Sequence, residues 1–198
     1  MLAREYIGEE FRSLHLLRLF LPAYDNSGVP RRWSSLLPSG AGLEASADCN
    51  ELWSTYLVDH PNAEPPNAPL GRLDRETAAA LREVLVAHLG TDLLLHTRTW
   101  VGRSRPFTPQ ATTSFFHGQE YLHEDLGIEE ILFRGVRDQV PDFVEDPTHS
   151  FAWGTGLYPD SLVIAASPDL FRALHQDLRL EVVSLVPHRD VLPAPFEG

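Results

Sequence analysis

The sequence has no lysine and a single cysteine, Cys49. Without a lysine amine, this chain has no side chain for a Schiff base, for a P-loop contact with phosphate or for a lysine general base. One cysteine cannot form an internal disulfide, so nothing indicates an oxidising compartment. Cys49 precedes an expected helix, but the adjacent carboxylate of Asp48 opposes deprotonation of its thiol, and we expect the thiol to be inert.

Long apolar runs and basic clusters are also missing. The longest apolar run, residues 14–21, spans about a third of a membrane and contains Arg18. The first ten residues are acidic rather than basic, so we expect a cytoplasmic protein without membrane contact. There are 28 acidic and 16 basic side chains, which gives a net charge of -12. Nucleic-acid binding requires a concentrated basic patch, and this composition argues against one.

The hydrophobic pattern predicts one α+β domain over 1–198, with a helical half at about 1–90 and a strand-rich half at about 91–198. Helices are expected at 2–13, 50–58, 75–89 and 167–174. Strands are expected at 15–21, 93–101, 129–136, 150–154, 161–166 and 179–186. The clearest helix is 75–89, because Asp74 can cap its start and Gly90 can terminate it. The order favours a mixed, mostly antiparallel sheet of about five strands with helices packed on one face.

Negative charge is concentrated between residues 117 and 146, where nine acids accompany only two arginines. Such a concentration costs self-repulsion, so a role outside stability can maintain it. Apolar residues, among them Phe133, lie between the acids, and acids with aromatic anchors suit a basic protein partner. The predicted partner-binding residues are Glu120, Tyr121, Glu124, Asp125, Glu129, Glu130, Asp138, Asp142, Phe143, Glu145 and Asp146. A solvated loop that only maintains solubility is the alternative.

Three residues within this segment are of the types that commonly bind metal ions: His117, Glu120 and His123. Their spacing of three residues offsets the two imidazoles by about 120° on a helix. On a strand, the glutamate would face away from both histidines. We therefore expect no metal or other cofactor, unless His96 or His149 arrives from elsewhere in the fold. Nine histidines leave open a metal-dependent hydrolase whose ligands come from separate segments.

A small basic cluster lies on the expected strand at 93–101 and directly after it. His96, Arg98 and Trp100 alternate along one side of that strand, and Arg103 and Arg105 follow. Guanidinium groups beside an aromatic ring suit a carboxylate or phosphate ligand. A small-anion sensor using Arg98, Trp100, Arg103 and Arg105 is therefore a further alternative, although these arginines can equally pair with the excess acids.

Taken together, these features favour a non-catalytic cytoplasmic protein of bacterial type that binds a basic protein partner, as an immunity protein or antitoxin does. The preference for arginine over lysine is typical of a GC-rich genome. The oligomeric state and the identity of the partner are left open by the sequence.

Overall fold

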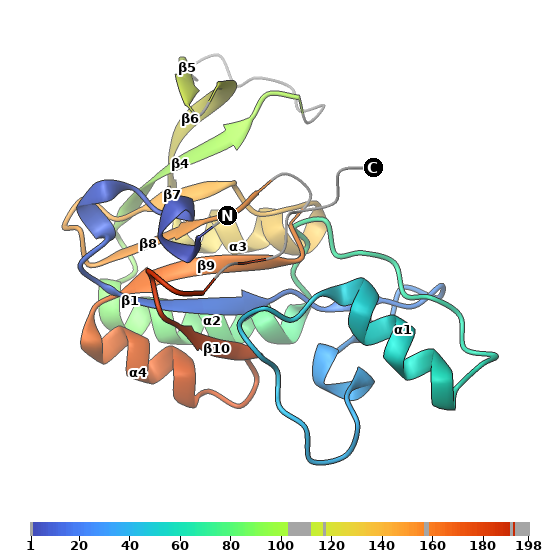
Figure 1. Cartoon of the computed structure of the whole chain (residues 1–198). Coiled ribbons are helices and arrows are strands. Elements are labelled where there is room, and N and C mark those ends of the chain that lie inside the picture. The colour runs from blue at the N-terminus through green and yellow to red at the C-terminus, as the bar shows by residue number, and fades with distance from the viewer. Residues whose placement is uncertain (1, 103–111, 117, 157–158, 191, 193–198) are drawn as a thin grey trace.

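The computed structural model describes residues 2–102, 112–116, 118–156, 159–190 and 192, with only the backbone of Phe116. The described chain has four α-helices and a large antiparallel sheet of eight strands, which confirms the predicted α+β class (Figure 1). The expected five strands were too few. Every pairing in this sheet is antiparallel, so the sheet is not mixed within the described residues.

The order of the strands brings distant parts of the chain together. Across the sheet the order is β10 (Val182–Leu185), β1 (His15–Phe20), β9 (Ser161–Ala166), β8 (Phe151–Gly154), β7 (Phe143–Glu145), β4 (Leu94–Trp100), β6 (Gln119–Gly127) and β5 (Thr112–Phe116). A separate two-stranded sheet pairs β2 (Ala23–Tyr24) with β3 (Pro30–Arg31). Because β1 lies between β9 and β10, the N-terminal region contributes a strand to the sheet built mainly from the C-terminal half.

Three helices, α2 (Arg75–Leu89), α3 (Ile128–Arg137) and α4 (Pro168–Gln176), cover one face of the sheet. Two short 3-10 helices, η1 (Ala3–Tyr6) and η2 (Glu9–Phe11), pack on the opposite face (Figure 1). The prediction of helices on one face therefore holds for α2, α3 and α4, but it omits η1 and η2, which cover the opposite face. At one end of the molecule, α1 (Cys49–Asp59) packs on η3 (Trp33–Leu36).

Local sequence explains several element boundaries. The carboxylate of Asp74 accepts a hydrogen bond from the backbone N–H of Thr77 at 2.7 Å, which caps α2. The helix ends at Gly90, whose φ of 88° lies in the region that favours glycine. β1 is buried on both sides: Leu17 and Leu19 face the helices, and the other side, which carries Leu16 and Arg18, is covered as well.

Two predicted elements were wrong. Residues 129–136 belong to α3 rather than to a strand, because Ile128, Ile131, Leu132 and Gly135 are buried at helical spacing. The stretch 115–125, for which the sequence predicted no strand, lies mostly in the paired strands β5 and β6. The expected helix at 2–13 is present only as η1 and η2.

Strands β4, β5 and β6 project beyond the body of the molecule, and we call this three-stranded unit the arm (Figure 1). β4 joins the arm to the body through its pairing with β7. In the described structure, β5 is the last strand at this edge of the sheet.

Candidate functional site on the arm

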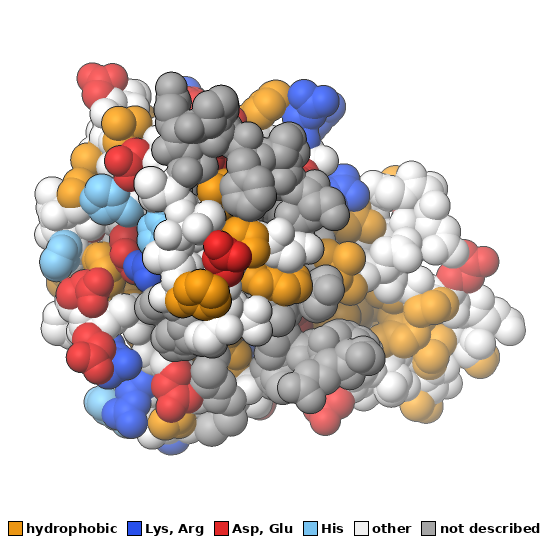
Figure 2. Space-filling model, turned by 90° about the horizontal axis from the view of Figure 1, so that it is seen from above, with side chains coloured by type: hydrophobic (Ala, Val, Ile, Leu, Met, Phe, Trp, Pro, Cys, Tyr) orange, Lys and Arg blue, Asp and Glu red, His pale blue; other side chains and the backbone are white. Residues whose placement is uncertain are grey.

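The acids of segment 117–146 do not form one surface. Glu124 and Glu130 both bond to Arg134, at 2.8 and 2.7 Å. Glu129 bonds to Arg82 of α2 at 2.5 Å. Acidic side chains also appear at several separate places on the face drawn in Figure 2. Much of the charge is therefore balanced by arginines of the same molecule.

Two further acids belong to the interior. Asp142 and Asp146 are each 1% exposed. Asp142 accepts a hydrogen bond from the backbone N–H of Trp100 at 2.7 Å. Asp146 accepts hydrogen bonds from the backbone N–H groups of Ser150 and Phe151 at 2.7 and 3.0 Å. Both carboxylates accept hydrogen bonds from backbone N–H groups in the interior. Asp142 and Asp146 were predicted to bind a partner, but they stabilise the fold instead.

Two of the predicted aromatic anchors are buried as well, whereas Phe133 is 55% exposed. Tyr121 and Phe143 are 6% and 8% exposed, and their rings meet edge to face with centroids 5.6 Å apart. Of the acids in the predicted partner-binding set, Asp125, Glu129, Glu130 and Asp138 are exposed and Glu120 is half-buried. The expectation of a basic partner stays a prediction, but these two aromatic rings are not available to it.

The predicted metal residues are not brought together. Glu120 and His123 lie three residues apart on β6, so their side chains point to opposite faces of the strand. His117 lies outside the described residues. Within the described part of the chain, no group of three or more histidine, cysteine or carboxylate side chains is arranged to hold a metal ion.

The predicted anion cluster is divided. Arg98 forms an ion pair with Glu145 of β7. The indole N–H of Trp100 donates to the side-chain oxygen of Gln119 at 3.1 Å. Arg103 and Arg105 lie outside the described residues. The predicted alternation of His96, Arg98 and Trp100 along one side of β4 is confirmed by the strand register.

That side of β4 belongs to a group of ionisable and hydroxyl side chains, which we call the polar face. Its members are His96, Arg98, Ser114, His123, Asp125 and Glu145, from strands β4, β5, β6 and β7. In the register of β4 and β6, His96 lies opposite Asp125 and Arg98 lies opposite His123. Directly opposed side chains of antiparallel strands are neighbours on the same face.

Two histidine contacts link the strands of the arm. His96 Nδ1 lies 2.6 Å from Asp125 Oδ1, linking β4 to β6. His123 Nε2 lies 2.5 Å from Ser114 Oγ, linking β6 to β5. Partial burial lowers the pKa of His123, and the positive charge of Arg98 lowers it further. The imidazole of His123 is therefore mainly neutral at pH 7 and can accept a proton.

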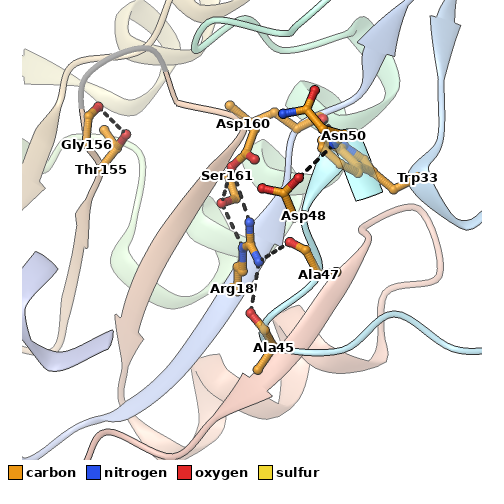
Figure 3. A network of polar contacts seen from close by, with 11 residues as sticks. Arg18, Trp33, Ala45, Ala47, Asp48, Asn50, Thr155, Gly156, Asp160 and Ser161 are labelled. Atoms are coloured by element: carbon orange, nitrogen blue, oxygen red, sulfur yellow. Dashed lines mark hydrogen bonds and ion pairs between the residues drawn. The ribbon is translucent and has the colours of Figure 1, made fainter. Parts of the chain in front are cut away.

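Arg18 of β1 forms a second polar network (Figure 3). The strand registers place Arg18 on the same face of the sheet as Arg98. The guanidinium is 1% exposed and donates through Nη1 to the carbonyl oxygens of Ala45 and Ala47, at 2.9 and 2.7 Å. Its Nε donates to Ser161 Oγ at 2.8 Å, and its Nη2 donates to Asp160 Oδ1 at 3.3 Å. These bonds hold the loop before α1 against β1 and β9.

The space beside Arg18 is too small for a substrate. The cavity there has a volume of about 20 Å³, which is enough for one water molecule. Nearby, burial and the carboxylates of Asp160 and Asp48 raise the pKa of Cys49 to about 12. The thiol is therefore protonated at neutral pH, which agrees with the predicted inert cysteine. The Arg18 network is structural, and the polar face is the better candidate site.

Sequence reasoning missed the two histidine contacts because it did not assign the 115–125 stretch to strands. The alternation of His96 and Arg98 was the available signal, since it already placed polar groups on one side of β4. The partners on β5, β6 and β7 depended on pairing between segments up to about fifty residues apart, which local patterns do not reveal.

Comparison with known proteins gives no relative: no family model, curated protein or solved structure matches this chain. Within the described residues, no helix has both the length and the apolar character required to cross a bilayer.

Proposed function

We propose that this protein binds a basic protein partner through its arm, in the manner of an immunity protein or antitoxin that covers the basic surface of a nuclease. The net charge of -12 would attract such a partner and direct its approach. The arm, which projects from the body, offers a place for contact without rearrangement of the core (Figure 1).

The outer strand of the arm is the observation that carries the proposal. β5, with the sequence Thr-Thr-Ser-Phe-Phe, contains no charged residue and no proline, the features that commonly block pairing at an edge strand. An extended segment of a partner can add to such an edge as another strand. We therefore place the main contact along β5.

Phe115 supplies an apolar anchor on this strand. Its side chain is 79% exposed, and Glu120 lies opposite it in the register of β5 and β6. An exposed aromatic ring beside a carboxylate suits a partner segment that combines an apolar contact with a basic side chain. The exposed carboxylate of Asp125 would add to the attraction at longer range.

The experiment is affinity capture from the source lysate at low and high salt, followed by calorimetry with the purified partner. Phe115→Ser removes the proposed anchor. Val58→Ser is the matched control, because Val58 on α1 is also 79% exposed. We expect a partner that high salt releases, with binding weakened about tenfold or more by Phe115→Ser and unchanged by Val58→Ser.

Charge is tested separately. Glu120→Arg is expected to slow association with the partner, whereas Glu51→Arg, on the exposed side of α1, is expected to have a smaller effect. Capture without any salt-sensitive partner would contradict the proposal, and so would equal binding by the Phe115 and Val58 variants.

A further inference from the structure

The contact between Ser114 and His123 has the geometry of a nucleophile and its base. Ser114 Oγ lies 2.5 Å from His123 Nε2, within the range in which an imidazole can take the hydroxyl proton. Ser114 is exposed on β5, while His123 is partly buried on β6. Backbone pairing of the two strands fixes the relative position of both side chains.

Charged groups around the imidazole of His123 favour this role. Asp125 lies two residues away on the same face of β6, Arg98 lies directly opposite on β4, and Glu145 of β7 is paired with that arginine. Burial and Arg98 lower the pKa of His123, so it is available as a base near pH 7. The two carboxylates act in the opposite direction and stabilise the imidazolium that forms when the proton is transferred.

We propose that Ser114 and His123 are the nucleophile and general base of a site that accepts acyl groups from carboxylic esters. This activity belongs to the free protein, because Ser114 lies on β5, the strand along which we place the partner. It departs from the expectation of a non-catalytic protein. Ser114 Oγ forms a bond to the acyl carbon, and its proton passes to His123 Nε2. The ester C–O bond breaks, and the departing alkoxide takes that proton. Water then adds to the acyl carbon through the same base, which releases the acid and restores the serine.

The charges of the polar face indicate which esters would bind. Asp125 and Glu145 carry two negative charges against the single positive charge of Arg98, and the chain as a whole carries -12. An anionic substrate would be repelled by this balance. The site therefore favours uncharged or cationic esters.

The test uses a fluorophosphonate reagent, which modifies activated serines, and p-nitrophenyl acetate as the ester. Peptide mass spectrometry on the full chain is expected to locate the phosphonyl group, and the acetyl group trapped by rapid quenching, on Ser114. His123→Gln should lower the labelling rate at least about 100-fold, in keeping with loss of a general base. Ser54→Ala, at an exposed serine of α1, should leave the rate unchanged.

Asp125→Asn tests the electrostatic argument. Because Asp125 raises the pKa of His123, its removal should shift the rising limb of the pH–rate profile to lower pH. Circular dichroism and thermal unfolding establish that each variant is folded. Absence of label on Ser114 in the folded wild-type protein would overturn the proposal, as would equal labelling in His123→Gln. Neither result bears on the Phe115 variants, so failure of this site and failure of partner binding are distinguishable.

Discussion

One face of the large sheet has a covered half and an open half, and the two contain similar residue types. In the covered half, beneath η1 and the loop before α1, Arg18 is bonded to Ser161 and Asp160. In the open half, on the arm, Arg98 is bonded to Glu145 and Ser114 contacts His123. An arginine, a carboxylate and a serine occur in both, and the open half adds the imidazoles of His96 and His123.

Solvent exposure, rather than residue type, therefore distinguishes the polar residues that stabilise the fold from those that can react or bind. Around Arg18 two backbone carbonyl groups complete the network, and the adjoining cavity admits only a water molecule. On the arm, Ser114 is exposed and His96 and Asp125 are each more than half exposed. Substitutions in the covered half should therefore affect stability, and those in the open half should affect binding or reactivity.

The largest effect is expected from Arg18→Met. This change removes a buried charge and leaves the carbonyl groups of Ala45 and Ala47 without their donor, so we expect a loss of about 3–5 kcal/mol in the free energy of unfolding. Urea denaturation measures it. The control is Arg82→Met, because that arginine and its partner Glu129 are 50% and 60% exposed. The control should cost less than about 1 kcal/mol, and equal losses in the two variants would remove the distinction between the halves.

Gly154→Ala comes next, because it tests how closely η1 covers the sheet. A Cβ atom at residue 154 would lie 1.8 Å from the backbone oxygen of Tyr6, so η1 would have to move. Overpacking of this kind costs about 1–3 kcal/mol. Gly127→Ala at the end of β6 is the control, since no atom lies within 4 Å of its added Cβ. Thermal unfolding that is equally affected by both variants would contradict the close approach of η1.

Local patterns predicted the elements whose signals lie within one segment. The boundaries of α2 followed from Asp74 and Gly90, and β1, β4, β8, β9 and β10 followed from short apolar runs. The strand expected at 129–136 was wrong because apolar content was weighed above spacing. The spacing of Ile128, Ile131 and Gly135 is that of one face of a helix and predicts α3.

The candidate site was less accessible to sequence reasoning than the fold class. Asp142 and Asp146 looked like surface charges, yet each satisfies backbone donors in the interior. A charge run in sequence does not specify which carboxylates turn inward, since that depends on backbone donors elsewhere in the fold. The pairing of Ser114 with His123 likewise required the register of β5 and β6.

Substitutions of Ser161 and Ser114 should differ in their effect on stability. Ser161 Oγ accepts from Arg18 Nε and donates to Asp160 Oδ1 at 2.7 Å. Ser161→Ala would leave a buried guanidinium donor without its acceptor, at a cost of about 1–3 kcal/mol. Ser114→Ala affects an exposed hydroxyl, and we expect a change within about 0.5 kcal/mol. Chemical denaturation of both variants gives the comparison, and a larger loss in the Ser114 variant would reverse the assignment of roles.

The smallest effect concerns the pH dependence of stability contributed by His123. Its folded pKa lies below its ordinary value of 6.5 because of burial and Arg98, so below that pH the unfolded chain binds the proton more readily than the folded one. The groups facing the imidazole are Arg98 on β4, Ser114 on β5, Asp125 on β6 and Glu145 on β7.

The stabilising contribution of neutral His123 is therefore complete above pH 6.5 and is lost as the pH falls toward the folded pKa. Urea denaturation of the wild type and His123→Gln should give a constant difference above this pH and a difference that shifts against the wild type below it. NMR titration of the imidazole measures the same quantity directly. A folded pKa above 6.5 would mean that Asp125 and Glu145 outweigh burial and Arg98, and the loss of stability expected at low pH would then be absent.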